Sequence, residues 1–361
     1  MNNLETYKVR KKKFNWFIGI DVSKNELDYA IVSGGQMLFH EEHQNNTPAV
    51  IGFCEGLKEK IPGFSLKKAL FCMEQSGLYC NPSLMAFRKL KVNVVCENAL
   101  RIKRSLGLVR GKDDKTDAIR IAVYAEKNQL HLKLWQPRRP IIEELMYLNT
   151  LRTRISSMSM SVVNRLKEQE KYIGIGLHQK IKKLCKNSDE ALKLDFLEIN
   201  NSIQNLIKGD ERLSRLHQII TSVKSVGNVT AIQVILSTNE FRDITCPKKF
   251  ACYAGVAPFK TESGLMKKKT RVSHVANKKM KALLHICALN ALRCDTEMKR
   301  YYERKTKTDG KPKMAVVNAI RYKLILRIFA CLKQDRLYQL EFHSPRIQTA
   351  GESMHLVNSQ V

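Results

Sequence analysis

Residues 16–32 read WFIGIDVSKNELDYAIV, and this stretch decides the fold of the first part of the chain. It predicts two short strands, residues 16–21 and 27–32, because both are rich in aromatic and branched side chains and a polar turn separates them. The first strand ends on a carboxylate, Asp21. The pattern therefore predicts the start of a β-sheet, with an acidic residue where its first strand ends.

The residues that follow alternate between apolar strands and amphipathic helices. We expect strands over residues 37–43, 69–73 and 92–97, and helices over residues 49–60, from Pro82 and over residues 114–126. Proline is common at the first helical position, which supports the helix that begins at Pro82. Strands that alternate with helices in this way predict an α/β domain.

A helical segment and a second globular region come next. Residues 141–208 follow a Pro-containing linker and repeat apolar residues about every three or four positions. This predicts a helical connector, either a coiled-coil hairpin or a plain packing or oligomerisation element. The fold class is therefore α/β plus all-α, in four parts: an α/β domain (1–135), the connector (136–215), a mostly helical and basic C-terminal domain (216–335) and a polar tail (336–361).

The charge of the chain points to a polyanionic partner. Its 361 residues include 63 Lys and Arg against 34 Asp and Glu, which gives a net charge of +29. Such a charge repels itself unless a polyanion neutralises it, so nucleic acid is the first candidate and an anionic membrane surface is the alternative. No run approaches the roughly 20 apolar residues that span a bilayer, and the start of the chain is not typical of a signal peptide. We therefore expect nucleic acid and no membrane.

The cysteines indicate a reducing compartment. None of the 10 forms a C-x-x-C pair, and they lie in apolar runs, such as Cys72 in ALFCME and Cys331 in IFACL. Cysteines in such runs are typical of buried, reduced side chains. This usage predicts a cytoplasmic protein.

Acidic residues stand where chemistry on phosphates would use them. Asp21 and Glu74 each end an apolar strand, and strand ends are where α/β sheets build their sites. Asp114 and Asp117 are three apart near a helix start and share one face, but Asp113 lies four before Asp117, so spacing does not choose between Asp113 and Asp114. A few carboxylates suffice to bind Mg²⁺, and paired ions promote phosphoryl transfer. The alternative is a turn residue and helix N-terminal acids with no joint role.

Two features of the second half could contact or cleave nucleic acid. Residues 222–231, SVKSVGNVTA, fit a helix–hairpin–helix turn that offers backbone N–H groups to phosphate, or an ordinary connection between helices. Ser263 precedes a basic stretch, Lys267 to Arg271, in what we expect to be a loop. A serine there could attack a phosphate while the basic side chains offset the developing charge, or it could be a turn serine.

Several motifs together resemble the DEDD transposases of the insertion-sequence one-ten family, which are related to the Piv-type DNA invertases. In the first half these are FIGIDVSKNELDYAIV, MEQSGLYCNPSLMAFRKL and RGKDDKTDAIRIAVYA. In the second half SVGNVTA, FACYAGVAPFKTESG, KKMKALLHICALNA and DGKPKMAVVNAI follow the order of the family's C-terminal region. The resemblance covers nearly the whole chain.

The resemblance implies a fold, a site and partners. The front of the chain would be a RuvC-like, ribonuclease-H-like domain, with Asp21, Glu74, Asp114 and Asp117 as ligands of Mg²⁺, or of Mn²⁺ as an alternative. Ser263 falls on the family's catalytic serine, which links transiently to DNA. The implied partners are donor and target DNA, a structured guide RNA encoded by the element, and further copies of the chain in a homodimer or homotetramer.

These observations lead to one expectation and three alternatives. We expect a transposase that cleaves and exchanges DNA strands through the four acids and Ser263. A RuvC-like nuclease would use the acids with water in place of the serine. A Piv-like invertase would use the same residues in another biological context, and a non-catalytic nucleic-acid-binding protein would use none of them.

Overall fold

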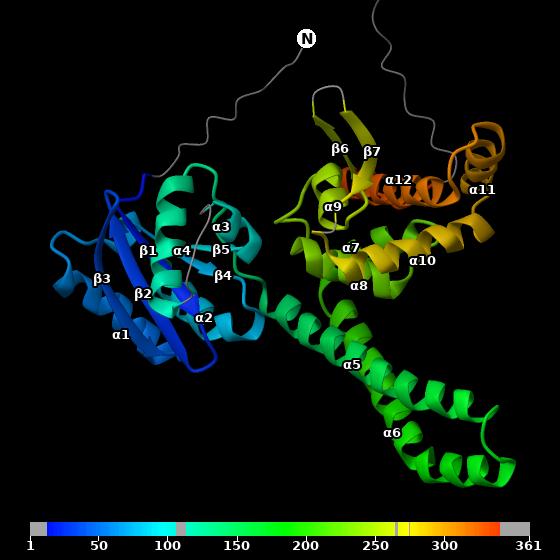
Figure 1. Ribbon diagram of the computed structural model, residues 1–361. Helices are drawn as coiled ribbons and strands as arrows, with labels where there is room; N and C mark the ends of the chain where they lie inside the picture. Colours follow the sequence, from blue (N-terminus) through cyan, green and yellow to red (C-terminus); the bar gives the residue numbers. More distant parts are fainter. Residues whose placement is uncertain (1–12, 106–112, 264–265, 274, 340–361) are drawn as a thin grey trace, which may run out of the picture. The chain divides into compact units, whose positions relative to one another are not determined.

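The computed structural model describes residues 13–105, 113–263, 266–273 and 275–339 (Figure 1). The chain divides into two compact units, residues 1–137 and residues 138–361, which we call unit 1 and unit 2. Most of the polar tail expected over residues 336–361 lies outside the described residues, as does the start of the basic run at Lys11. Each unit is described by itself below.

Unit 1 is built on one five-stranded sheet in the order β3-β2-β1-β4-β5. Strands β1, β2 and β3 are joined antiparallel, while β4 and β5 run parallel to β1. The strands expected from the sequence are confirmed, with ends that differ by at most two residues. They are β1 (Trp16–Val22), β2 (Glu26–Ser33), β3 (Gln36–Gln44), β4 (Ala69–Glu74) and β5 (Asn93–Glu97).

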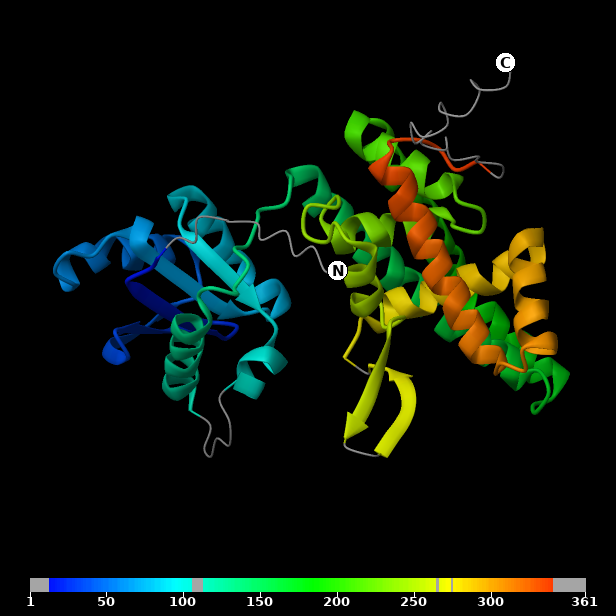
Figure 2. The ribbon, with the colours of Figure 1, turned by 90° about the horizontal axis from the view of Figure 1, so that it is seen from above.

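Helices cover both faces of this sheet (Figure 1 and Figure 2). Side chains alternate along a strand, so Ile18 and Ile20 of β1 pack in one apolar cluster with α1 (Thr47–Lys60) and α2 (Asn81–Leu90). Phe17 points the other way and packs in a second cluster with α4 (Asp114–Asn128) and the short α3 (Ala99–Ser105). Two 3-10 turns, η1 (Leu66–Lys68) and η2 (Gly77–Cys80), flank β4.

Local sequence explains where these helices begin. The N-cap of α1 is Asn46, whose side chain accepts a hydrogen bond from the backbone N–H of Ala49 at 2.9 Å, and Pro48 lies in the first turn. The helices predicted over residues 49–60, from Pro82 and over residues 114–126 are confirmed, whereas α3 was not expected.

A glycine lets α4 lie directly against the sheet. A Cβ atom at Gly19 would be 2.1 Å from the carbonyl oxygen of Ala118 and 2.3 Å from the backbone nitrogen of Ala122, so no other residue fits without moving the helix. Ala118 and Ala122 are themselves small and fully buried. The first turn of α4 is therefore held beside the end of β1, where Asp21 stands.

Unit 2 is mostly helical. The predicted connector is a helical hairpin of α5 (Pro140–Gln169) and α6 (Ile175–Lys208), which pack along each other. The remaining elements are α7 (Glu211–Ser222), α8 (Asn228–Thr238), α9 (Pro247–Tyr253), β6 (Pro258–Ser263), β7 (Met266–Val272), α10 (Lys278–Cys294), α11 (Thr296–Glu303), a π-helical turn η3 (Arg304–Thr308) and α12 (Lys313–Lys333). The helices α7 to α12 share one apolar core with the start of α5 and the end of α6. Within the ranges described above, we find no helix with the length and apolar character to span a bilayer.

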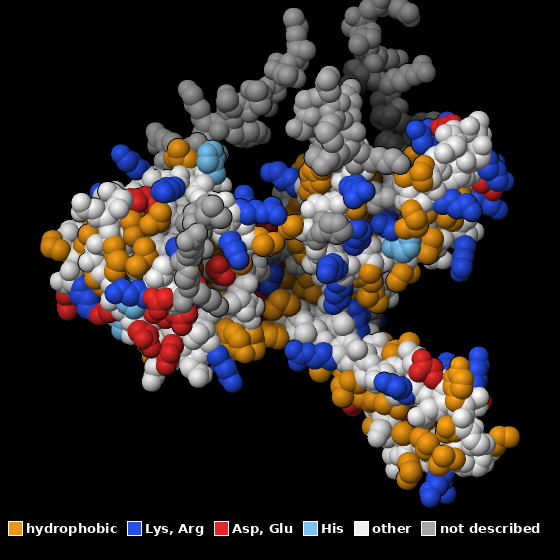
Figure 3. All heavy atoms as spheres, viewed as in Figure 1, with side chains coloured by type: hydrophobic (Ala, Val, Ile, Leu, Met, Phe, Trp, Pro, Cys, Tyr) orange, Lys and Arg blue, Asp and Glu red, His pale blue; other side chains and the backbone are white. Residues whose placement is uncertain are grey.

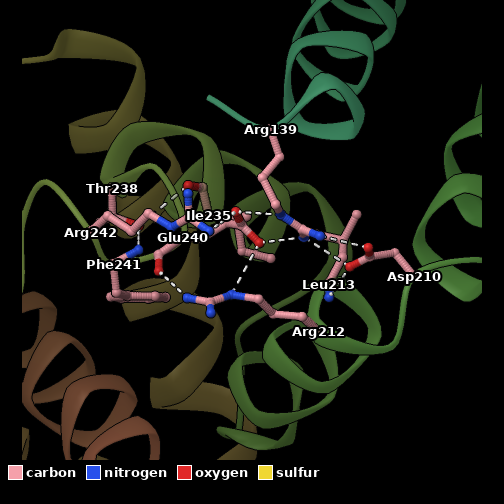
Figure 4. Close-up of polar contacts among 9 residues, drawn as sticks. All are labelled: Arg139, Asp210, Arg212, Leu213, Ile235, Thr238, Glu240, Phe241 and Arg242. Carbon is pink, nitrogen blue, oxygen red and sulfur yellow. Dashed lines mark hydrogen bonds and ion pairs between the residues drawn. The ribbon is translucent and has the colours of Figure 1, made fainter. Parts of the chain in front are cut away.

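Buried ion pairs fix the start of α5 to the core of unit 2 (Figure 4). Arg139, the N-cap of α5, donates to both carboxylate oxygens of Asp210 at 2.7 and 2.8 Å and to Glu240 at 2.5 and 2.9 Å. The Glu240 side chain is fully buried and also pairs with Arg212 and Arg242. These contacts join residues that are 101 positions apart in the sequence.

One expectation about unit 2 is wrong. The stretch that contains Ser263 was expected to be a basic loop, but it forms the antiparallel hairpin β6–β7. The connection at residues 222–231 is a short turn between α7 and α8, as either sequence interpretation predicted. The hairpin escaped the sequence analysis because β7, MKKKTRV, has no alternation of apolar and polar residues.

Candidate active site

The carboxylates Asp21 and Glu74 lie on neighbouring strands at the same end of the sheet. In the parallel pair β1–β4, Ile20 is opposite Met73, so the next residue on each strand is one of these acids. Both point to the face that α4 covers, because they share the alternation of Phe17 on β1 and Leu70 on β4. The pairing of strands far apart in the sequence thus brings the first two predicted acids together.

Helix α4 adds two more carboxylates to this end of the sheet. Asp114 and Asp117 lie in its first turn, and Gly19 allows that helix to contact β1 two residues before Asp21. Asp117 pairs with Arg120 at 2.6 Å, and Asp114 is exposed. Asp113 is the N-cap residue, with an extended backbone, and its carboxylate accepts from the Thr116 hydroxyl at 3.2 Å. Asp and Glu side chains gather at this end of unit 1 in Figure 3.

The pKa of Asp21 reflects both its burial and the charges of the neighbouring acids. Burial, which is the largest cause, and the negative charges of Asp117, Asp114 and Glu74 together raise the pKa of Asp21 to about 6. The hydrogen bond that Asp21 accepts from the backbone N–H of Val22, at 3.0 Å, opposes the rise. An elevated carboxylate pKa at a sheet edge is typical of a functional site.

These four acids, which we call the acidic cluster, are near one another but do not form a closed ligand cage. Across the described part of the chain, no group of three or more His, Cys, Asp or Glu side chains is arranged to hold a metal ion. The pKa of Asp21 shows that Asp114, Asp117 and Glu74 act on it by charge. The cluster therefore concentrates negative charge on one surface and can attract a cation.

The sequence analysis missed a further carboxylate beside the acidic cluster. Glu97 ends β5 directly opposite Glu74, so β1, β4 and β5 each carry an acid on the same face, at the last residue of the strand or next to it. Glu97 is buried and accepts from the hydroxyl of Tyr124 at 3.0 Å and from the guanidinium of Arg101 at 3.0 and 3.2 Å. Tyr124 lies on α4, so this contact ties the helix of the acidic cluster to the sheet edge.

Glu97 could have been found from the sequence only by asking which residue of β5 lies opposite Glu74 in the sheet. VNVVCE (residues 92–97) was predicted as a strand, and its last residue could have been compared with Asp21 and Glu74, which end the other two strands. A second acid that the sequence analysis did not single out is Asp28, which is opposite Asp21 in the β1–β2 pair. Its carboxylate lies 2.8 Å from the imidazole Nε2 of His40, so its charge has a partner of its own.

Ser263 belongs to unit 2 and is the last residue of β6. It pairs with Met266 at the end of the hairpin farthest from the core. The base of the hairpin is anchored, since the side chain of Asn318 on α12 donates to the carbonyl oxygen of Val256 at 2.7 Å. Gly255 has a φ of +64°, and a Cβ there would lie 2.6 Å from the Cβ of Ala276, so the turn into β6 requires glycine. The acidic cluster and Ser263 therefore lie in different units.

Comparison with known proteins matches both halves of the chain. Residues 18–169 match a family model of DEDD type described as "Transposase", and residues 217–303 match the "Transposase IS116/IS110/IS902 family". The chain is 23% identical over 336 residues to the "Pilin gene-inverting protein" of Moraxella bovis, which covers 91% of this chain and 98% of that protein. The protein of the same name from Moraxella lacunata is similar to the same extent.

Proposed function

Since the chain belongs to the DEDD transposases of the IS110 family and is thus a DNA-recombining enzyme, we propose that it cleaves and exchanges the DNA strands of an insertion sequence. In this proposal the acidic cluster and Ser263 are the catalytic residues. The observation that carries it is the convergence of the four acids where β1, β4 and α4 meet, since Asp21 and Glu74 end neighbouring strands on the face that α4 covers. The charges of the other three acids contribute to the raised pKa of Asp21, after burial.

The proposed fold of unit 1 is that of a RuvC-like, ribonuclease-H-like domain. Support comes from the sheet order β3-β2-β1-β4-β5, with three antiparallel strands followed by two parallel ones. We keep the division at residues 135, 215 and 335 as a proposal for the functional parts of the chain. In this division unit 1 supplies the acids, the α5–α6 hairpin is the helical connector, and the rest of unit 2 supplies the serine.

The chemistry of the four carboxylates suits a divalent cation. Burial and the negative charges of its neighbours disfavour the ionised form of Asp21, and a positive ion would offset both effects. Oxygen ligands of this kind favour Mg²⁺, with Mn²⁺ as the alternative, and Asp21, Glu74, Asp114 and Asp117 would hold it. Such an ion would supply charge stabilisation to the phosphoryl group under attack. Asp113 remains the alternative to Asp114.

Ser263 is the proposed nucleophile. Its hydroxyl oxygen bonds to phosphorus while the bond from phosphorus to the leaving deoxyribose oxygen breaks, and the proton of the serine ends on that leaving oxygen. Arg271 on β7 and the neighbouring lysines would offset the developing charge. Since the acids and the serine lie in different units, we propose that they meet between the subunits of a homodimer or homotetramer.

The charge of the chain supports more than one nucleic-acid partner. A net charge of +29 suits donor DNA, target DNA and a structured guide RNA encoded beside the gene. The RNA is tested by purifying the protein and sequencing the nucleic acid that stays bound. A discrete RNA from beside the gene supports the guided mechanism, and random fragments contradict it.

A second candidate function is site-specific inversion of a DNA segment. The observation that favours it is the similarity to the pilin gene-inverting proteins over nearly their whole length. Inversion uses the same cleavage and rejoining of DNA strands as transposition. The two reactions differ in how the recombination sites are arranged on the DNA.

The test is recombination of a reporter plasmid that carries the ends of the element. Glu74→Gln and Ser263→Ala should each abolish recombination while the far-UV spectrum stays unchanged. Glu59→Gln, which changes an exposed acid of α1, is the matched control and should recombine normally. Full recombination by Glu74→Gln would contradict the role of the acidic cluster.

A further inference from the structure

The buried charges of the described residues fall into two classes. Each of the three buried acids, Glu97, Glu240 and Asp295, pairs with at least one arginine. Two arginines, Arg152 and Arg321, are also buried, yet neither has a carboxylate partner among the residues that the structure describes. A buried charge without a counter-charge is unfavourable, so these two guanidinium groups call for an explanation.

Arg152 lies on α5, where the hairpin meets the rest of unit 2, and only 6% of its surface is exposed. Its guanidinium donates to side-chain oxygens of Asn149 at 2.6 Å and Asn200 at 3.5 Å. Asn149 in turn donates to Gln233 of α8 at 3.4 Å. The surroundings of this cation are therefore neutral amides, which orient the guanidinium but do not balance its charge.

A second cation lies beside it. The ammonium of Lys279, in the first turn of α10, donates to the hydroxyl of Thr153 on α5 at 3.1 Å. Thr153 follows Arg152 on α5, so this bond brings the ammonium to the same turn of the helix, and burial and the charge of Arg152 both lower the pKa of Lys279. Lys279 is exposed, so an anion can approach the pair from solvent.

The contacts of Arg321 differ from those of Arg152. It donates to the imidazole Nδ1 of His285 at 2.6 Å and to Asn318 at 3.3 Å. Arg321 lies between α10 and α12 and orients Asn318. The side chain of Asn318 also donates to the carbonyl oxygen of Val256 at the base of the β6–β7 hairpin. We therefore assign Arg321 a structural role and consider only Arg152 and Lys279 as anion-binding residues.

We propose that Arg152 and Lys279 bind a phosphodiester group of a nucleic-acid backbone where α5 and α10 meet. The site lies in unit 2, and nothing assigned to the acidic cluster or Ser263 includes it. Phosphate fits because guanidinium and ammonium groups donate strong, charge-assisted hydrogen bonds to its oxygens. The hydroxyl of Thr153 accepts from Lys279 and donates to the carbonyl oxygen of Asn149 at 2.8 Å, so it positions the ammonium.

The contact would position nucleic acid without reading its sequence. The inference rests on the proposed function only in that a nucleic acid is the partner, and it does not require cleavage. Binding can therefore be measured in EDTA, where no strand is cut. The probes are a labelled 30-base-pair DNA duplex and a labelled single-stranded RNA, followed by fluorescence anisotropy from 50 to 300 mM NaCl.

Lys279→Gln should reduce the slope of log affinity against log salt by about 1 and weaken binding about fivefold at 0.15 M salt, the loss expected for one phosphate contact. Lys278→Gln is the matched control, since it removes the same charge from the neighbouring exposed position of α10. Equal losses in both variants would overturn the site, because they would reflect net charge alone. A loss with DNA only, with RNA only or with both identifies which backbone is bound, and a loss with neither overturns the proposal.

Arg152→Met separates binding from folding. If Arg152 serves an anion, its replacement lowers the salt slope of the folded protein as Lys279→Gln does, whereas the loss of its hydrogen bonds to Asn149 and Asn200 affects the thermal unfolding temperature in either case. If Arg152 only supports packing, the folded fraction of the variant binds with the normal slope, which contradicts the proposal. No strand is cut in this assay, so a failure of the catalytic assignment would not imitate a failure of this site.

Discussion

The acidic cluster should make the metal-free protein less stable at neutral pH, and Asp21→Asn should remove that penalty. The folded protein holds the Asp21 proton with a pKa of about 6, whereas the ordinary value is 3.8. The folded state therefore binds more protons than the unfolded state between these values, so stability falls as the pH rises through that window and stays low above it. Asparagine has no charge to repel, so the variant should be more stable.

The size of the effect follows from the two pKa values. The difference between 3.8 and about 6 corresponds to ~3 kcal/mol at most above pH 7. Asp21 is only half-buried, and solvent screens part of the repulsion, so we expect Asp21→Asn to raise the free energy of unfolding by about 1–2 kcal/mol at pH 7.5. At pH 4.5 the gain should shrink to about a third, because the wild-type carboxyl is then mostly protonated in the folded state.

The assay is urea unfolding in EDTA, followed by tryptophan fluorescence. The chain has two tryptophans, Trp16 and Trp135, and both lie in unit 1, so the signal reports the unit that contains the acidic cluster. Trp16 packs against Phe64 with ring centroids 5.1 Å apart, which makes its emission sensitive to unfolding. Millimolar Mg²⁺ should stabilise the wild type more than the variant and close the gap.

Glu41→Gln is the matched control. Burial acts to raise the pKa of Glu41, but hydrogen bonds from Lys60 and His43 outweigh it and lower that pKa, so this acid stabilises the fold above its unfolded pKa. Its replacement should destabilise unit 1 at pH 7.5, opposite in sign to Asp21→Asn. The reasoning is refuted if Asp21→Asn unfolds at lower urea than the wild type in EDTA, or if Mg²⁺ stabilises both proteins equally.

Three further predictions concern packing around the site and the core of unit 2. Gly19→Ala should cost about 1–3 kcal/mol in the same fluorescence assay and reduce plasmid recombination at least tenfold, because the added Cβ pushes α4 from β1; normal recombination would contradict the role of that contact. Tyr124→Phe should destabilise unit 1 by about 1–3 kcal/mol, because it leaves the buried Glu97 with one partner fewer, and an unchanged urea midpoint would be the contrary result. Glu240→Gln should destabilise unit 2 by about 2–4 kcal/mol, measured by far-UV circular dichroism, because Arg139 and its neighbours lose their buried carboxylate; a change below 1 kcal/mol would refute this.

The sequence was sufficient to predict the sheet of unit 1 and where its first acids lie. The two strands of WFIGIDVSKNELDYAIV carry strong aromatic and branched patterns, and a residue that ends an apolar strand must lie at a sheet edge, so Asp21 and Glu74 were accessible to simple reasoning. The closeness of α4 to β1 was not, because Gly19 has no side chain whose pattern could indicate the contact.

The features that escaped prediction depend on pairing between distant residues. Glu97 joins the edge only through the register of β4 and β5, and no local pattern sets that register. Arg and Glu side chains are usually exposed, and nothing near Arg139 or Glu240 in the sequence indicates that these two residues pair in the fold. The β6–β7 hairpin consists of basic, polar strands, so its pairing had no apolar periodicity to reveal it.

The most direct test of the central proposal is to look for the covalent link between protein and DNA. The wild type is incubated with Mg²⁺, its co-purified RNA and DNA that carries the element's ends, then denatured and digested for mass spectrometry. We predict a DNA phosphate on the peptide that contains Ser263, and no such adduct in Ser263→Ala or in Glu74→Gln. A strand cut without any adduct, or an adduct on another residue with Ser263→Ala fully active, would contradict the account.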